Sequence, residues 1–355
     1  MAQVTAVDVT VRGGGIFGLC TAWACARRGA RVRLVERRAI GAGSSGGIVG
    51  ALAPHVPENW NDKKAFQLDS LLMAEGYWAE IETVSGLSTG YGRLGRLQPL
   101  ADGHAVDMAR ARSTGAARLW QDRARWEVVE ARDFPDWAPP SATGLLIHDT
   151  LSARLHPRLA CLALAAACRA RGVEIVIGDA PDAGAPDSGA VVWATGYEGL
   201  AELSRTLGKT VGNGVKGQAV LLGFDASDKP QLYADGLHIV PHGNGTVAIG
   251  STSEREFEAP DRTDAQCDAL LARARAACPP LGTAPVLERW AGVRPRAKSR
   301  APMLGPWPGR PGHFIANGGF KIGFGMAPKA AEAMADLIVE NRDTLPDGFR
   351  VEASL

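Results

Sequence analysis

Three glycines and one glutamate near the start of the chain have types and spacing that suit binding of a dinucleotide. Gly13, Gly15 and Gly18 follow the pattern G-x-G-x-x-G, and Glu36 stands 18 residues beyond Gly18, at the end of an apolar segment. The first glycine permits a tight turn, the second lets a pyrophosphate approach the backbone, and the third lets a helix pack closely on a strand. The start of that helix offers unpaired N–H groups to phosphates.

A carboxylate at Glu36 can accept hydrogen bonds from both ribose hydroxyls of an adenosine, and it would repel a 2′-phosphate. The flanking apolar segments therefore predict a strand, helix and strand around a dinucleotide site. The alternative is a glycine-rich turn in an ordinary α/β domain. Arg12 occupies a position where an apolar strand residue is expected, and it either faces the phosphates or pairs with an acid.

Composition limits the classes of protein that the chain can belong to. Its 355 residues are enough for two structural units, and 46% hydrophobic with 22% charged residues is typical of a globular protein. The formal net charge of +1 provides no bulk basic field for nucleic acid or an anionic membrane. No apolar run reaches the roughly 18 residues that span a bilayer, and no export signal precedes the first strand.

The cysteines indicate a reducing compartment. None of the six forms a C-x-x-C pair or has metal-ligand spacing with histidine. We therefore expect no metal site and a cytoplasmic protein. The cysteines are Cys20, Cys25, Cys161, Cys168, Cys267 and Cys278.

Apolar periodicity predicts further elements along the chain. Helices are expected at residues 65–84, 156–171 and from about Pro328 to Arg342, and strands at 173–177 and 191–193, with strand-like segments near 216–222, 236–240 and 246–252. Residues 90–140 show only short-range, tryptophan-rich patterns, and residues 178–189 suggest a surface loop.

Nucleotide-binding features occur at the start, middle and end of the chain, so we predict two interleaved units. The fold class is α/β, with a Rossmann-like dinucleotide-binding domain and an α+β domain built on an antiparallel sheet. The predicted dinucleotide-binding domain comprises residues 1–55, 145–215 and 286–355. The predicted substrate domain comprises residues 56–144 and 216–285.

Seven motifs in this order resemble FAD-dependent oxidoreductases of the D-amino-acid oxidase and glycine oxidase type. They cover essentially the whole chain: VRGGGIFG with Glu36, GSSGGIVGALAP (43–54), VVWATG (191–196), VKGQAV (215–220), HIVPHGNGTVAIGSTS (238–253), WAGVRP (290–295) and NGGFKIGFGMAP (317–328).

The resemblance implies a set of FAD-binding residues. The cofactor is expected to be non-covalent, because no cysteine lies in a family context for flavin attachment. Ala180 or a close neighbour would lie along the adenine. The implied FAD-binding residues are Gly13, Gly15, Ile16, Phe17, Gly18, Glu36, Arg37, Ser44, Ser45, Gly46, Ala180, Ala194, Thr195, Gly196, Gly292, Arg294, Gly318, Gly319, Phe320, Lys321 and Ile322.

The resemblance also implies the catalytic residues Arg294, Lys321, His238 and Tyr233. Arg294 matches the arginine that grips the substrate carboxylate, for which a planar guanidinium gives a two-pronged, charge-assisted match. Alternatively, Arg294 pairs with a structural acid, Lys321 is solvated rather than near flavin N1 and C2=O, and His238 is a satisfied core residue. The basic cluster at 289–300 is either a solvated rim or a mark of a substrate with extra negative charge.

Several positions depart from the family pattern, mostly around the substrate. His238 replaces a tyrosine common before I-V-P, Lys321 replaces a frequent arginine, and Ser299-Arg300 replace a usual Asp-Gly pair. A small β-meander before VVWATG is shortened to the loop at 178–189. These departures leave the substrate open.

The resemblance implies oxidation of the C–N bond of an amino or imino acid by hydride transfer to flavin N5. The donor would be a D-amino acid, glycine or an N-substituted glycine. The acceptor is oxygen or a quinone or other electron carrier, and an oligomer is compatible with the sequence. The alternatives are an oxidase acting on a carboxymethylaminomethyl-uridine of tRNA, which the near-neutral charge disfavours, a 2-hydroxy-acid or polyol-phosphate dehydrogenase on the same fold, and a non-enzymatic flavin-binding protein.

Overall fold

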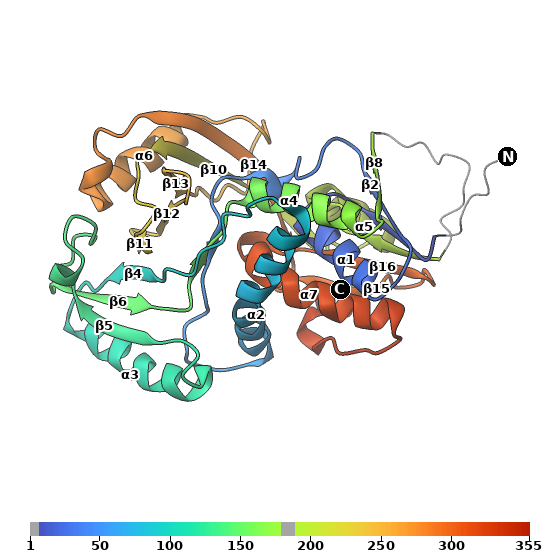
Figure 1. Cartoon of the computed structure of the whole chain (residues 1–355), viewed down its shortest axis with the longest axis horizontal. Coiled ribbons are helices and arrows are strands. Elements are labelled where there is room, and N and C mark those ends of the chain that lie inside the picture. Colours follow the sequence, from blue (N-terminus) through green and yellow to red (C-terminus); the bar gives the residue numbers. More distant parts are fainter. Residues whose placement is uncertain (1–6, 179–188) are drawn as a thin grey trace.

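The computed structural model describes residues 7–178 and 189–355, and their strands form two large sheets (Figure 1). One sheet has six strands and the other has eight. The six-stranded sheet and its helices lie on the right of Figure 1, and the eight-stranded sheet lies on the left. The chain passes between these units several times, as expected from the scattered nucleotide-binding motifs.

The six-stranded sheet has the order β15-β16-β9-β1-β2-β8. All neighbouring pairs are parallel except β15 with β16. The core strand β1 is buried on both sides because helices cover the sheet, as is usual for parallel sheets. The strands are β1 (Val9–Arg12), β2 (Val32–Glu36), β8 (Glu174–Ile177), β9 (Ala190–Trp193), β15 (Met303–Pro306) and β16 (His313–Asn317).

Helix α1 (Ile16–Arg27) is the central helix of this unit. Ten of its residues, including Trp23, are buried, because α4 (Pro157–Ala170) and α7 (Gly323–Val339) pack against it. Helix α2 (Asp62–Ser85) in turn packs on both α4 and α7. On the other side, α5 (Gly196–Leu207) buries Leu200 and Leu203 with strand residues of the sheet.

The eight-stranded sheet has the order β14-β10-β13-β12-β11-β4-β6-β5. It is antiparallel except for the pair β11 and β4. Helix α6 (Ala265–Ala277) packs on β10 and β13, and α3 (Gly103–Trp120) packs on β5. The strands are β4 (Arg96–Pro99), β5 (Trp126–Glu130), β6 (Leu145–Asp149), β10 (Gly212–Gly223), β11 (Gln231–Ala234), β12 (Leu237–Pro241), β13 (Thr246–Gly250) and β14 (Val286–Ala297).

Several short elements complete the fold. Strands β3 (Ala51–Leu52) and β7 (Ala153–Arg154) form a two-stranded sheet. The 3₁₀ turns are η1 (Ser44–Gly46), η2 (Ala131–Asp133), η3 (Pro279–Leu281), η4 (Phe320–Ile322), η5 (Asp347–Phe349) and η6 (Val351–Ser354).

The structure corrects several predicted elements. Helix α7 begins at Gly323, so the expected start near Pro328 is wrong. Pro328 lies inside the helix and is buried, so packing against α1 and α2 outweighs the loss of one backbone donor. Helices α3, α5 and α6 were not predicted. Two of them are capped by aspartate, since Asp102 accepts from Ala105 N–H and Asp264 accepts from Gln266 N–H.

Three strands disagree with the predicted domain boundaries, and one of them, β10, runs across the boundary between residues 215 and 216. Strands β6 and β14 fall within ranges predicted for the dinucleotide-binding domain (145–215 and 286–355), but both belong to the eight-stranded sheet. Each pairs with antiparallel neighbours from the other unit, which local patterns cannot reveal. The remaining boundaries stay a prediction.

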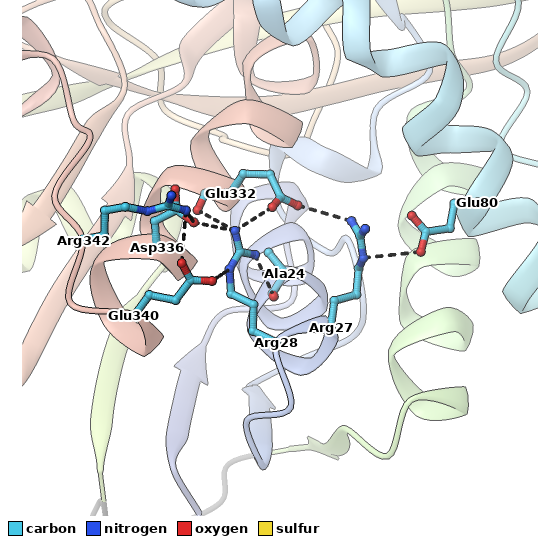
Figure 2. A network of polar contacts seen from close by, with 8 residues as sticks. All are labelled: Ala24, Arg27, Arg28, Glu80, Glu332, Asp336, Glu340 and Arg342. Carbon is cyan, nitrogen blue, oxygen red and sulfur yellow. Dashed lines mark hydrogen bonds and ion pairs between the residues drawn. The ribbon is translucent and has the colours of Figure 1, made fainter.

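A cluster of charges joins the first helix to the last (Figure 2). The Arg28 guanidinium forms ion pairs of 2.8 Å with Glu332, 2.6 Å with Asp336 and 3.0 Å with Glu340, all on or beside α7. Arg27 connects Glu332 to Glu80 of α2. The side chain of Arg28 is only 17% exposed, so these contacts fix α1 against α7.

Candidate active site

A cavity of about 660 Å³ lies where the two sheets meet. One end, the glycine end, is lined by Gly13, Gly15, Glu36, Ser45 and Thr195. The other end, the arginine end, is lined by Tyr233, His238, Trp290, Arg294 and Lys321. The glycine end lies at the carboxyl ends of parallel strands, where ligands bind in open α/β sheets. The arginine end is formed mainly by the antiparallel sheet.

The glycine turn has no room for side chains. Gly13 has a φ of +110°, and a Cβ there would lie 2.4 Å from the carbonyl oxygen of Ala194. A Cβ at Gly18 would lie 1.9 Å from the carbonyl oxygen of Gly13. Both glycines are therefore required for β1, α1 and β9 to approach one another, as the spacing predicted.

The amino end of α1 opens towards the cavity. Gly15 is its N-cap and supplies no side-chain hydrogen bond, while Ile16 N–H donates to Ser45 Oγ at 3.0 Å. This arrangement leaves the positive end of the helix dipole available to an anionic ligand. Ser45 comes from η1, so the predicted serine loop lies directly beside the glycine turn.

The carboxylate of Glu36 accepts two backbone hydrogen bonds at the glycine turn. Oε2 accepts from Gly14 N–H at 2.7 Å, and Oε1 accepts from Arg38 N–H at 2.9 Å. The same side chain lines the cavity. Its neighbour Arg37 also lines the cavity and forms an ion pair with Glu198 in the first turn of α5.

Arg294 projects from β14 into the arginine end. Its Nη2 donates to Ser251 Oγ at 2.6 Å, and its Nη1 donates to Thr252 C=O at 3.3 Å. A Cβ at Gly217 would lie 2.0 Å from Nη2, so only glycine leaves space for the guanidinium there. Burial lowers the pKa of Arg294 to about 10, and the charge of Glu254 opposes this shift.

A buried polar network lies behind Arg294. Thr252 Oγ1 and Gln218 Nε2 both donate to Glu254 Oε1, the latter at 3.1 Å. Lys216 Nζ lies 3.3 Å from Glu254 and 3.5 Å from Asp264. Lys216 is 3% exposed and Glu254 is 8% exposed. Because Thr252 contacts both Arg294 and Glu254, the network supports the position of the guanidinium.

His238 and Tyr233 lie together on β12 and β11. Their ring centroids are 4.8 Å apart, and the Arg96 guanidinium lies over the Tyr233 ring. Burial lowers the pKa of His238 to about 3, with further lowering by the charges of Arg96, Lys321 and Arg294. His238 is therefore a neutral imidazole, and its buried Nδ1 has no hydrogen-bond partner among the described residues.

Residues 319–321 form another wall of the cavity. Gly319 packs so closely on Phe17 that a Cβ would lie 2.3 Å from its ring. Phe320 and Lys321 both line the cavity, and Lys321 Nζ lies 5.8 Å from the centre of the Phe320 ring. Partial burial and then the charge of Arg294 lower the pKa of Lys321.

Most of the predicted site residues line this one cavity. Ala180 lies outside the described residues. Five others do not line it, although Gly292 leaves room beneath the indole of Trp290, where a Cβ would lie 2.4 Å from that ring. Those five are Gly18, Gly46, Gly292, Gly318 and Ile322. The cavity-lining predicted residues are Gly13, Gly15, Ile16, Phe17, Glu36, Arg37, Ser44, Ser45, Ala194, Thr195, Gly196, Tyr233, His238, Arg294, Gly319, Phe320 and Lys321.

Several lining residues were not predicted. Trp290 lies on β14, two alternations before Arg294, so the period of a strand places both on one face. Trp193 also lines the cavity, next to Arg12. The two residues are register partners on β9 and β1, and the Arg12 guanidinium lies 5.2 Å from the indole. Neither contact has a local sequence signal beyond strand alternation.

The glycine end fits the diphosphate and ribose of FAD. A Cβ at Gly13 would meet backbone, the N-cap of α1 is a glycine, and a carboxylate stands at the end of β2. Among residues 7–178 and 189–355, no helix is long and apolar enough to cross a membrane. The same ranges hold no cluster of three or more side chains suited to a metal ion.

Comparison with known proteins gives relatives along nearly the whole chain. The Bifunctional protein ThiO/ThiG of Nostoc sp. is 26% identical over 98% of this chain and 55% of the relative. The chain thus spans about half the length of the first curated relatives it matches. Glycine oxidase of Bacillus licheniformis is 26% identical over 94% of this chain and 93% of the relative.

The fold also matches solved structures. The crystal structure of iminodiacetate oxidase from Chelativorans sp. has a TM-score of 0.82 at 20% identity, covering 97% of this chain and 98% of that one. Residues 8–337 match the family model described as FAD dependent oxidoreductase. Since this match covers most of the chain and includes both ends of the cavity, the chain belongs to the FAD dependent oxidoreductase family.

Proposed function

We propose that this protein oxidises the C–N bond of an amino or imino acid, namely a D-amino acid, glycine or an N-substituted glycine. The observation that carries the proposal is Arg294, a partly buried guanidinium that faces the same cavity as the glycine end. As a member of its family the protein uses FAD. Held at the glycine end by the turn at Gly13 and Gly15, FAD would supply a hydride acceptor for the donor's α-hydrogen, and the N–H proton would leave to solvent as the C–N bond becomes an imine.

Arg294 binds and orients the donor's carboxylate. Its hydrogen bonds to Ser251 and Thr252 fix the plane of the guanidinium, so that its remaining N–H groups can meet a carboxylate in two-pronged fashion. Its lowered pKa of about 10 still leaves the side chain charged at neutral pH. Fixing the donor in one orientation is the main contribution that a protein makes to such a reaction.

No side chain at the arginine end needs to act as a general base. With a pKa of about 3, His238 is neutral at physiological pH, and it offers a hydrogen-bonding nitrogen to the donor. The cations Arg294 and Lys321 favour a donor whose amine arrives without its proton. Water then hydrolyses the released imine, which gives a 2-oxo acid or an aldehyde together with ammonia or an amine.

The relatives named glycine oxidase and iminodiacetate oxidase support an amino- or imino-acid donor. The electron acceptor is oxygen or a quinone or other electron carrier, and an oligomer is compatible with the fold. Six cysteines without a disulfide support a reducing, cytoplasmic compartment. None of the described cavity-lining residues is a cysteine, which supports non-covalent FAD.

The test is anaerobic mixing of the FAD-loaded protein with matched panels of amino acids and 2-hydroxy acids. We expect amino acids to remove the ~450 nm absorption band of oxidised flavin and hydroxy acids to leave it. Reduction by hydroxy acids alone would favour a dehydrogenase of hydroxy acids. No reduction by any amine would refute the proposal.

Arg294→Met, compared with Arg289→Met, tests the carboxylate contact. Both arginines lie on β14, but Arg289 pairs with Asp268 and does not line the cavity. Losing one or two charge-assisted hydrogen bonds should raise KM for carboxylated amines roughly 100-fold in the Arg294 variant. The Arg289 variant should retain the wild-type KM, and an unchanged KM in the Arg294 variant would discard the assignment.

A further inference from the structure

Charge is distributed unevenly between the two ends of the cavity. The described acidic residues that line it are Glu36, Glu198 and Glu202, all at or beside the glycine end on β2 and α5. The arginine end presents Arg294 and Lys321 and, among the described lining residues, no carboxylate. A donor bound there therefore meets two cations and no acid.

Among the described residues, neither Arg294 nor Lys321 has an ion-pair partner of its own. Glu254, the acid behind Arg294, pairs with Lys216. Glu254 and its partners lie on the side of Thr252 away from the cavity and oppose the loss of charge at Arg294. No described carboxylate lies within ion-pair distance of Lys321 Nζ, whose described neighbour is the Phe320 ring. Burial lowers the pKa of Lys321, and the charge of Arg294 lowers it further.

More cations lie on the other side of the wall formed by residues 319–321. A groove of about 320 Å³, here called the basic groove, is lined by Arg255, Arg296, Lys298 and Arg300, and its lining contains no described acid. The Arg296 guanidinium lies 5.5 Å from the Phe320 ring, and Arg296 forms a backbone bridge with Gly319. The positive field at the arginine end therefore continues to the surface, where it attracts anions.

We infer that the physiological donor is a dianionic amine, which carries a second acidic group besides the carboxylate held by Arg294. The second group binds Lys321. This inference rests on the proposed function and narrows its donor class to amino or imino acids with two carboxylates or an equivalent acid.

A second anionic group improves the fit for a physical reason. A donor with one carboxylate compensates Arg294 and leaves Lys321 without an anion in a partly buried place, which is unfavourable. A donor with two acidic groups compensates both cations with charge-assisted hydrogen bonds. A donor with a cationic side chain would add a third positive charge with no acid to receive it.

The experiment compares donors that differ only in the second group. Iminodiacetate carries two carboxylates, its monoamide replaces one with a neutral group of similar size, and N-methylglycine lacks it altogether. One charge-assisted contact should make kcat/KM for iminodiacetate at least about tenfold higher than for the monoamide. The difference should lie in KM, because the reacting C–N bond is the same.

Lys321→Met should abolish that preference, and Lys329→Met is the matched control. Lys329 is nearby in sequence on α7, pairs with Asp69 and does not line the cavity. We expect the Lys321 variant to lose the tenfold preference because KM rises more for iminodiacetate than for its monoamide, while the Lys329 variant keeps the preference. Retained bound flavin and an unchanged thermal midpoint would confirm that each variant is folded.

Binding without reaction provides an independent measurement. Thiodiacetate has the shape of iminodiacetate but no oxidisable amine, and (methylthio)acetate lacks its second carboxylate. Calorimetric titration of the FAD-loaded protein should show tighter binding of thiodiacetate, with the difference lost in Lys321→Met.

Three outcomes would overturn the inference. Equal kcat/KM for iminodiacetate and its monoamide would remove the second contact, although reduction by amines would still support the proposed function. An equal fall in kcat for all donors in Lys321→Met would assign Lys321 to the flavin instead. Failure of every amine to reduce the flavin would refute the proposed function, and this inference with it.

Discussion

Backbone atoms form one end of the cavity, and side chains form the other. The glycine end consists of backbone, namely a turn with no room for a Cβ, the start of α1 and the ends of parallel strands. The arginine end consists of side chains from β11, β12, β14 and η4, supported by a buried ion pair. In the proposed function, the glycine end binds a cofactor common to many enzymes and the arginine end selects the donor.

Because of this contrast, substitutions at the two ends should have different effects. A change in the glycine turn acts on sterics and should remove the cofactor whatever the donor. A change at the arginine end acts on charge and should alter stability, pH dependence or donor choice while leaving FAD bound.

The largest effect is expected for Gly18→Ala. The new Cβ would lie 1.9 Å from the Gly13 carbonyl oxygen, which is backbone and cannot move aside cheaply. We expect the purified variant to lose its bound flavin, measured as the ratio of flavin to protein absorbance after gel filtration. Gly103→Ala is the matched control, because no atom lies within 4 Å of the added Cβ there. A Gly18 variant that stays fully yellow would contradict the packing argument.

Lys216→Met should test the ion pair behind Arg294. It leaves the Glu254 carboxylate buried without its cation, so the free energy of unfolding should fall by about 3 kcal/mol. Denaturant titration measures the change. The double variant Lys216→Met with Glu254→Gln should recover part of the loss, since glutamine needs no counter-charge.

Lys209→Met provides the control for this comparison because Lys209 is exposed. Its effect should stay within about 0.5 kcal/mol. If the two lysine variants were equally stable, the buried pair would contribute nothing beyond an exposed lysine.

The pH dependence of stability should reveal His238. In the unfolded chain a histidine takes up a proton as pH falls below its ordinary pKa near 6.5, whereas folded His238 stays neutral down to about pH 3. Below about pH 6.5 the unfolded state therefore binds more protons than the folded state. The free energy of unfolding decreases as the pH is lowered. Between pH 7.5 and 5.5 this residue should remove about 1 kcal/mol, a loss absent from His238→Asn.

Tyr233→Phe serves as the control for His238, since it keeps the neighbouring ring and the imidazole. Thermal unfolding at several pH values would measure both variants. Identical slopes for wild type and His238→Asn would show that the imidazole titrates normally in the folded protein.

The smallest effect is expected at Arg300. This residue has a φ of +60° where the family usually has glycine, and a left-handed conformation strains any residue with a Cβ. Arg300→Gly should therefore raise the free energy of unfolding by about 0.5 to 1 kcal/mol, net of the extra freedom of glycine in the unfolded chain. Arg300→Lys keeps the strain and should show no gain in denaturant titration.

The same contrast explains how much could be predicted from sequence. Gly13, Gly15, Gly18 and Glu36 lie within one strand–helix–strand segment. Their positions relative to one another can therefore be predicted from their spacing in the sequence. The family motifs then placed Arg294, His238 and Lys321 in one site, and all three line the cavity.

Other features depend on pairings between distant segments. Glu254 and Lys216 meet through a bridge between β10 and the loop after β13, and Trp290 reaches the cavity only because β14 joins the antiparallel sheet. Helices α3 and α6 were not predicted although Asp102 and Asp264 cap them, because few of their residues are buried.

The ion pairs of Arg28 with α7 have a consequence for how the protein is made. The first helix of the chain finds its charged partners more than 300 residues later, at Glu332, Asp336 and Glu340. Synthesis begins at the amino end, so α1 and the strands beside it are made long before α7. We expect this part of the Rossmann-like unit to stay partly exposed until α7 has been synthesised. A nascent chain stalled before residue 323 should therefore remain sensitive to protease around α1.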